Sequence, residues 1–176
     1  MVAFSANFYY MDYKDQLVQT GKLNDTGYKL QENVPDSYRM GVELSLAYTP
    51  TEWLRLDGNL TLSRNKIKNY TAYYEYYDNQ TDWNELPQTS EFYKSTDISF
   101  SPNTVGSGII TFILFAEKDI RFSLINKYVG RMHYDNTFHP DNWWSAYCIT
   151  EVMASYSLST HKAGKFDSQV FINNML

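Results

Sequence analysis

Residues 38–48 read Tyr38-Arg39-Met40-Gly41-Val42-Glu43-Leu44-Ser45-Leu46-Ala47-Tyr48, and apolar side chains alternate along them with polar or small ones. The even-numbered positions hold the large apolar side chains, and the odd-numbered positions hold Arg, Gly, Glu, Ser and Ala. Successive side chains of a β-strand point to opposite faces, so this two-residue period predicts a strand with one apolar and one polar face.

The same alternation continues on both sides of this segment. It places Val2, Phe4, Ala6, Phe8 and Tyr10 on one face of an earlier strand, and Leu54, Leu56, Gly58, Leu60 and Leu62 on one face of a later strand. The Asp57-Gly58 pair is interpreted as strand rather than hairpin turn, because the alternation runs through it. Further strands are predicted over about 104–114, 120–128 and 152–158, and from near Phe166. The sequence predicts an all-β, antiparallel up-and-down meander of about seven strands.

Long and short connections alternate between the predicted strands. The long ones cover residues 12–37, 66–103 and 131–142, and the short ones cover 49–52, 115–118 and 159–164. In a meander, every second connection lies at the same end of the sheet, so the long loops are expected at one end. Short turns at one end and long loops at the other are typical of outer-membrane β-barrels.

Strand length and aromatic placement agree with a membrane-spanning sheet. Residues 38–48 and 54–64 match the roughly 9–11 residues with which a tilted strand crosses a bilayer. The strand ends carry aromatic side chains, namely Tyr38, Tyr48, Trp53, Tyr128, Trp143 and Trp144. We interpret them as two girdles at the membrane interfaces. A soluble barrel or sandwich is the alternative, because aromatic residues also flank its strands.

Composition excludes several classes of protein. The 176 residues carry a formal net charge of -5 without a basic run, which argues against nucleic-acid binding. The 17% aromatic content argues against disorder. A single cysteine, Cys148, excludes an internal disulfide and a multi-thiolate zinc site, and it is expected to be a small buried or lipid-facing residue. The longest apolar run, Ile109 to Ala116, is too short for a spanning helix.

No metal, cofactor or catalytic site is predicted. His133 and His139 lie near Asp135 and Asp141, but no regular element fixes these side chains as a ligand set. None of the three histidines lies on a strand beside a plausible nucleophile, so the chain is not expected to be an enzyme.

Several stretches, taken in order, resemble the C-terminal part of the β-barrel of TonB-dependent outer-membrane receptors. They are Phe8-Tyr9-Tyr10-Met11-Asp12-Tyr13-Lys14-Asp15-Gln16-Leu17, Gly41-Val42-Glu43-Leu44, Leu56-Asp57-Gly58-Asn59-Leu60-Thr61-Leu62-Ser63-Arg64-Asn65, Asp97-Ile98-Ser99-Phe100-Ser101-Pro102, Lys127-Tyr128-Val129-Gly130-Arg131 with Tyr134-Asp135-Asn136-Thr137, and Asn173-Asn174. Together they cover most of the chain outside the long loops.

The resemblance implies active uptake of a scarce ligand, such as an iron–siderophore complex, across the outer membrane of a Gram-negative bacterium. The expected partners are outer-membrane lipids, the receptor's own plug domain, TonB acting through an N-terminal region, and the metal–siderophore ligand. Residues 1–176 are expected to be the C-terminal portion of the barrel, without signal peptide or plug and with the last strand or strands missing. An open sheet in lipid leaves unpaired backbone groups at its edges, so we expect a fragment that neither inserts nor transports alone. The alternative function is a soluble, lectin-like carbohydrate-binding module.

Two groups of residues are candidate sites. The lumen-facing candidates are Arg39, Glu43, Arg55, Asp57, Asn59 and Arg121, whose alternative role is to hydrate the wall and pair with neighbouring strands. The ligand-binding loop candidates are Tyr73, Tyr74, Tyr76, Tyr77 and Trp83, because clustered aromatic rings with hydroxyl groups suit catecholate or sugar-like ligands. The alternative is a loop packed by its own side chains.

Overall fold

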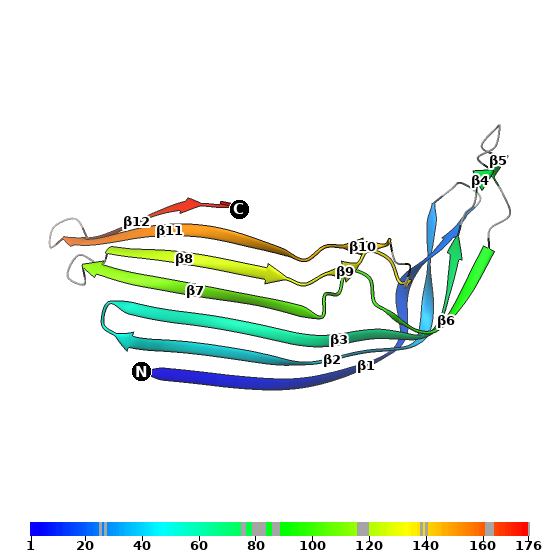
Figure 1. Cartoon of the computed structure of the whole chain (residues 1–176), viewed down its shortest axis with the longest axis horizontal. Coiled ribbons are helices and arrows are strands. Elements are labelled where there is room, and N and C mark those ends of the chain that lie inside the picture. Colours follow the sequence, from blue (N-terminus) through cyan, green and yellow to red (C-terminus); the bar gives the residue numbers. More distant parts are fainter. Residues whose placement is uncertain are drawn as a thin grey trace.

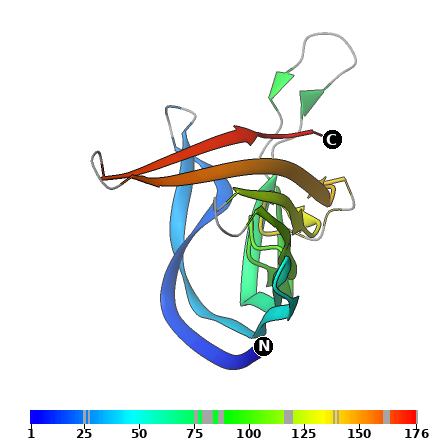
Figure 2. The ribbon, with the colours of Figure 1, turned by 90° about the vertical axis from the view of Figure 1, so that its left-hand side faces the viewer.

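A computed structural model shows one large antiparallel sheet that does not close (Figure 1), and the view from its end shows it curved and open between β1 and β12 (Figure 2). It describes all residues except 25, 27, 75–76, 79–83, 86–88, 116–119, 138, 140, 161–163 and 176, and it describes only the backbone at 23, 29, 77–78, 84–85, 115 and 160. The main strands are β1 (Val2–Leu23), β2 (Lys29–Thr51), β3 (Leu54–Tyr74), β6 (Thr89–Asp97), β7 (Thr104–Phe115), β8 (Ile120–Val129), β11 (Tyr147–Thr160) and β12 (Gly164–Ile172). Two short pairs, β4 (Tyr77–Asp78) with β5 (Asn84–Glu85) and β9 (Met132–His133) with β10 (Trp143–Trp144), lie outside it.

The strand order confirms the meander. Neighbours follow the order β1-β2-β3-β7-β8-β11-β12, and β6 pairs with β3 as well. The first part of β3 pairs with β7 and the last part with β6, so these two strands share one position beside β3. Seven positions therefore hold the eight strands that the described residues form in this sheet. Gly58 lies inside β3, as the continuous alternation predicted.

The strand ends joined by short connections lie at one end of the sheet and those joined by long connections lie at the other, as the alternation of the connection lengths predicted. The β2–β3 turn, the ends of β7 and β11 and the starts of β8 and β12 lie at one end of the sheet, as does the N-terminus (Figure 1). The β1–β2 and β3–β6 hairpins and the β8–β11 connection lie at the other end, which we call the hairpin end (Figure 1).

The prediction that residues 12–37 and 66–103 are mainly loops is wrong. β1 continues to Leu23 and β2 already begins at Lys29, while β3 continues to Tyr74 and β6 occupies Thr89–Asp97. The strands therefore run well past the segment that the apolar alternation marks. At the hairpin end they turn sharply out of the main sheet (Figure 1).

One row of residues across three strands explains the bend. Asp15 falls opposite Pro35 in the β1–β2 register, and the β2–β3 ladder ends one row before Pro35 and Asn69. Asp15 and Asn69 both have positive φ, at 54° and 51°, and proline has no backbone N–H to offer a ladder. Beyond this row β2 pairs only with β1 and β3 only with β6, so the sheet splits into two hairpins.

The positive-φ residues also change which face of the strand the side chains after them point to. Ile67 and Tyr70 are three residues apart and would face opposite ways in a regular strand, yet both are buried in one core. Likewise Ser37, which pairs with Tyr13 in register, donates a hydrogen bond to Gln16. The small core, Val18, Val34, Ile67, Tyr70, Ala72 and Ile98, therefore lies where the two hairpins leave the sheet. A two-residue period cannot be followed through such a shift, which is why the sequence predicted loops there.

Asn69 offers a test of this bend. Its side chain is exposed, so a substitution changes mainly the backbone preference. Asn69→Val is expected to lower the free energy of unfolding by about 1–3 kcal/mol, because a β-branched residue is strained at positive φ. Asn69→Gly is expected to be neutral or slightly stabilising. Denaturant unfolding of both variants checks this, and equal effects of Val and Gly would contradict it.

The start of the sixth predicted strand also differs from expectation. Trp143 and Trp144 do not open β11 but form β10, which pairs with His133 and Met132 of β9. The Trp143 ring packs against the His133 ring at a tilt of 33° with centroids 3.5 Å apart, and Phe100 contacts Trp144 edge-on at 5.5 Å. These aromatic contacts hold the pair beside the 98–103 segment instead of in the sheet.

Candidate functional site

All six lumen-facing candidates lie on one face of the sheet, which we call the polar face. The register pairs Glu43 with Thr61, Asp57 with Ala47 and Asn59 with Ser45, all odd-numbered positions of β2 and β3. Arg39 shares this parity on β2, and the register extends it to Arg55 on β3 and to Arg121 on β8. The structure therefore brings the six together on one surface, spread over several strands rather than gathered in one pocket.

Cross-strand hydrogen bonds connect the polar face. Asn7 donates to Glu43 at 3.1 Å, and Asn59 donates to Ser107 at 2.8 Å. Within β3, Arg55 makes two hydrogen bonds to Asp57, at 2.7 and 2.8 Å, which do not cross to another strand. Arg39 donates to Ser101 at 3.1 Å, so it joins β2 to the 98–103 segment. These contacts show that part of the set pairs with neighbouring strands, as the alternative interpretation expected.

The opposite face, which we call the apolar face, carries the even-numbered side chains of the same strands. Phe4 pairs with Leu46, Phe8 with Val42 and Leu44 with Leu60. Large apolar side chains are exposed along it, among them Phe4, Phe8, Leu46, Leu60, Leu62, Ile110, Phe122, Leu124 and Val170. Asn126 and Thr150 are polar residues on this face and are joined by a 2.9 Å hydrogen bond.

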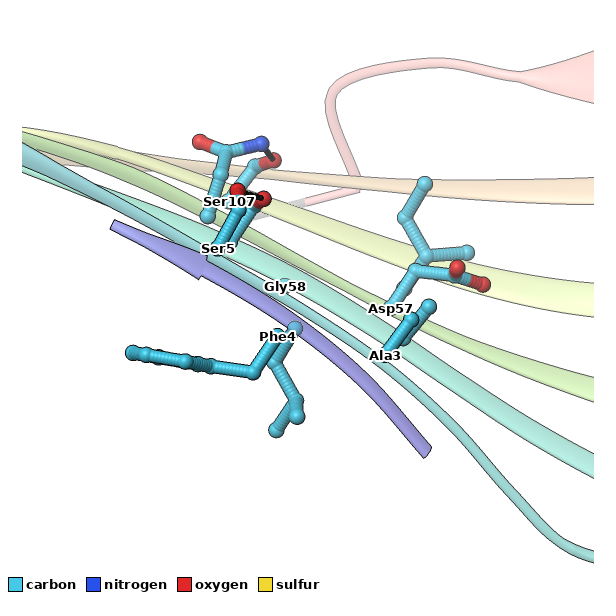
Figure 3. Close-up of a pocket in the computed structure, with 11 residues that line it drawn as sticks. Ala3, Phe4, Ser5, Asp57, Gly58 and Ser107 are labelled. Carbon is cyan, nitrogen blue, oxygen red and sulfur yellow. Dashed lines mark hydrogen bonds between the residues drawn. The ribbon is translucent and has the colours of Figure 1, made fainter. Parts of the chain in front are cut away.

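Figure 3 shows the two faces around Gly58. Ser5, Ser107 and Asp57 lie on one side of the strands, and Phe4 lies on the other (Figure 3). A shallow hollow of about 380 Å³ lies beside Gly58, which has no side chain to fill it. Exposed apolar surface on one side and hydrogen-bonded polar surface on the other suit a wall between lipid and water.

The aromatic candidates are only partly placed. Tyr76 and Trp83 lie outside the described residues, and for Tyr77 the structure describes only the backbone, which pairs with Glu85. Tyr73 and Tyr74 end β3, where the Tyr74 hydroxyl contacts that of Tyr93 at 2.7 Å. The Lys22 ammonium lies 5.4 Å from the centre of the Tyr73 ring. Tyr73 and Tyr74 also line a hollow of about 270 Å³ between the two hairpins and the 134–142 segment.

A buried hydrogen-bond cluster, which we call the Gln19 clamp, joins four segments that sequence reasoning did not connect. The Gln19 carbonyl accepts hydrogen bonds from the Tyr70 hydroxyl at 2.8 Å and from the Asn136 amide at 2.9 Å. The Asn136 carbonyl oxygen accepts from the Ser99 backbone N–H at 2.7 Å. The clamp thus holds β1, β3 and the 98–103 and 131–142 segments together under the hollow.

Tyr70 keeps this clamp intact over a wide pH range. Burial raises the pKa of its hydroxyl from the usual 10.0 to about 12, so the group remains a hydrogen-bond donor at neutral pH. Because the pKa is higher in the folded protein than in the unfolded chain, the stabilisation is complete below pH 10 and is lost as the pH rises through about 12.

The two histidines that the structure describes, His133 and His139, do not share a metal site. His133 is buried, and its Nε2 lies 3.8 Å from a carboxylate oxygen of Asp97. His139 lies 3.9 Å from Asp141, and His161 is outside the described residues. Within the described part of the chain, no three His, Cys, Asp or Glu side chains could share a metal ion. The same residues contain no helix long and apolar enough to cross a membrane.

Comparison with known proteins supports the resemblance seen in the sequence. Residues 2–175 match the model of the family described as TonB dependent receptor-like, beta-barrel. The chain belongs to this family. No match was found among curated proteins.

Two solved structures from Acinetobacter baumannii share the fold of this TonB-dependent receptor barrel segment. They are the siderophore receptor PiuA, with a TM-score of 0.61 and 17% identity, and the siderophore receptor PirA, with 0.57 and 16%. Each match covers 99% of this chain but only 22% of PiuA and 25% of PirA. The chain therefore spans about a quarter or less of these receptors.

Proposed function

We propose that residues 1–176 form the C-terminal portion of the barrel wall of an outer-membrane receptor in a Gram-negative bacterium. The observation that carries the proposal is the two-faced sheet, found in a chain of the TonB-dependent receptor family. The apolar face would contact outer-membrane lipid, and the polar face would contact the hydrated lumen and the receptor's own plug domain. Arg39, Glu43, Arg55, Asp57, Asn59 and Arg121 are the proposed lumen-facing residues.

The receptor is proposed to take up a scarce ligand of the iron–siderophore type, with energy supplied by TonB through an N-terminal region. Two fold relatives described as siderophore receptors support this ligand class. Tyr73 and Tyr74 at the hairpin end are the described part of the proposed ligand-binding group, with Tyr76, Tyr77 and Trp83. Aromatic rings with hydroxyl groups suit flat, oxygen-rich ligands such as metal–catecholate complexes. The role is transport rather than catalysis.

An uptake experiment tests this proposal. Cells that depend on the complete receptor containing these residues are supplied with radioactive iron bound to a catecholate siderophore. Uptake is expected to need TonB and the proton gradient, whereas binding of the complex to the cells needs neither. Accumulation that continues without TonB would contradict the proposed energy source, and absence of both binding and uptake would contradict the ligand class.

The same assay tests the aromatic group. Replacing Tyr73 and Tyr74 with alanine is expected to weaken binding about tenfold, which corresponds to about 1.4 kcal/mol of lost contact energy. Tyr28→Ala is the matched control, because Tyr28 is exposed near the tip of the β1–β2 hairpin and does not line the hollow. Equal losses in the two variants would show that Tyr73 and Tyr74 have no special part in binding.

A further inference from the structure

Two neighbouring hollows lie near the hairpin end of the sheet. The first, of about 450 Å³, has Phe8, Tyr10, Val42, Leu62, Arg64 and Asn103 in its lining. The second, of about 610 Å³, has Asp97, Asn103, Tyr128, Arg131 and Trp143 in its lining. Because Asn103 lines both, we treat them as one feature and call it the rim recess.

The interruption between β6 and β7 creates the rim recess. β6 ends at Asp97 and β7 begins at Thr104, so residues 98–103 leave the ladder beside β3. Single hydrogen bonds bridge the gap, from the Ser63 N–H to the Asn103 carbonyl and from the Gly130 N–H to the Thr104 carbonyl, each 2.8 Å long. Arg64 lies in β3 at this break, between the pairings with β7 and β6.

Two exposed arginines flank the rim recess. Arg64 is even-numbered and pairs with Met40, which places it on the apolar face, and Arg131 is the second residue after the end of β8. The Arg131 guanidinium lies 4.6 Å from the centre of the Trp143 ring, which orients it and leaves its N–H groups able to donate. Among the described residues, neither arginine forms an ion pair. Two guanidinium groups are therefore available to an anion.

Lysine side chains neutralise the charge of most carboxylates around the rim recess. Asp97 is the carboxylate in its lining, and Lys66 pairs with it at 2.6 Å. Asp36 pairs with Lys14, and Lys68 faces it from the next strand. Asp12 pairs with Tyr38 in register and lies on edge strand β1, two strands away from Arg64. Exposed Lys68, 5.5 Å from the Tyr38 ring centre, adds a third cation on the same face.

Apolar and aromatic surface adjoins these cations. Phe8, Tyr10 and Leu62 are exposed on the apolar face within the first hollow, and Tyr128 is exposed in the second. A surface with guanidinium groups at one end and exposed aliphatic and aromatic side chains at the other matches a molecule with an anionic head and apolar chains. A free anion would leave the apolar part uncovered.

We propose that the rim recess binds the phosphate-bearing headgroup of a membrane lipid, whose acyl chains lie along Phe8, Val42 and Leu62. Arg64 and Arg131 donate hydrogen bonds to the phosphate oxygens, and Tyr10 and Tyr128 mark the boundary between headgroup and chains. The inference rests on the proposed function in one respect, namely that the apolar face contacts lipid.

The test measures lipid binding to the complete receptor, purified in uncharged detergent. Native mass spectrometry follows the retention of phosphatidylglycerol and of diacylglycerol with the same acyl chains. Phosphatidylglycerol is expected to bind at least tenfold more tightly, and the combined substitution Arg64→Gln with Arg131→Gln is expected to remove most of this preference. Arg64→Lys with Arg131→Lys keeps the charge and is expected to retain part of it.

Lys165→Gln is the matched control, because Lys165 is an exposed cation near the start of β12, at the opposite end of the sheet. It is expected to leave the preference unchanged. Equal binding of the two lipids, or an equal effect of the control, would overturn the proposal. Complete displacement by millimolar inorganic phosphate would also overturn it, because the site would then be one for free anions.

Failure of the proposed function gives a different result. If the wild-type receptor inserts into membranes and transports no siderophore yet prefers phosphatidylglycerol, only the proposed ligand is wrong. If the wild-type receptor does not insert, the apolar face does not contact lipid. The proposed lipid site is then wrong as well. Variants are compared only after their resistance to protease shows that the barrel has formed.

Discussion

Leu60→Arg is expected to destabilise the folded, membrane-inserted barrel by about 2–4 kcal/mol, the cost of arginine on the lipid side of a barrel near the bilayer midplane. Leu60 lies on the apolar face, pairs with Leu44 in register and is 37% exposed. It also lies near the middle of the amphipathic part of β3. A charge there would have to leave water without a partner in the hydrocarbon.

Thr61→Arg is the matched control, because the residue next in sequence points to the other face. Thr61 pairs with Glu43 in register, so a new arginine would stand across from a carboxylate on the polar face. Opposite charges on directly paired positions are slightly favourable, and we expect a change within about 1 kcal/mol. The two variants differ by one position along the chain and introduce the same side chain.

The measurement is the free energy of unfolding of the complete receptor in lipid vesicles, with outer-membrane assembly in cells as a second readout. A large loss for Leu60→Arg and a small one for Thr61→Arg would establish which face meets lipid. If the losses were equal, or reversed, the assignment of Arg39, Glu43 and the other polar candidates to the lumen would fail. A soluble barrel with water on both sides of this sheet would tolerate arginine at Leu60 far better.

The central part of the sheet was predictable because each strand there repeats one simple rule. Alternation along residues 38–48 and 54–64 determines which side chains share a face, and the observed register keeps those faces aligned across the sheet. A register slip by one residue would have exchanged the two faces, so the pattern strongly limits the pairing. The same rule placed the six polar candidates on one face before their contacts were known.

The hairpin end was not predictable in the same way. Asp15, Pro35 and Asn69 are ordinary turn-forming residues in the sequence, and only their alignment in one row shows that they bend paired strands instead of ending them. The Gln19 clamp has no sequence signal at all. Gln19 and Asn136 are 117 residues apart, and their hydrogen bond depends on how the hairpins fold back over the 131–142 segment.

The Gln19 clamp leads to the second large effect. Asn136→Leu is expected to lower the stability of the hairpin end by about 2–4 kcal/mol, because a buried amide is replaced by an apolar side chain of similar size. Asn136 is 2% exposed. The substitution leaves the Ser99 N–H without its acceptor and removes one of the two donors to the Gln19 carbonyl.

The effect should be local, since the clamp lies beyond the row of Asp15, Pro35 and Asn69 while the main ladder lies before it. Hydrogen exchange is therefore the suitable measurement. The amides of residues 98–101 and 103 and of the last residues of β1 are expected to exchange about 30-fold to 1,000-fold faster, as 2–4 kcal/mol of local opening implies. Amides of β7 and β8 are expected to exchange at unchanged rates.

Tyr134→Phe provides the control within the same segment. It removes an exposed hydrogen bond of 2.7 Å from the Tyr134 hydroxyl to Asn142, whose loss water can compensate. Its effect is expected to stay below about 1 kcal/mol. If both variants accelerated exchange equally, the 131–142 segment would be held by its surface contacts. If neither did, packing of Val18, Val34 and Tyr70 alone would be sufficient to hold the hairpins, and the position of Tyr73 and Tyr74 would not depend on the clamp.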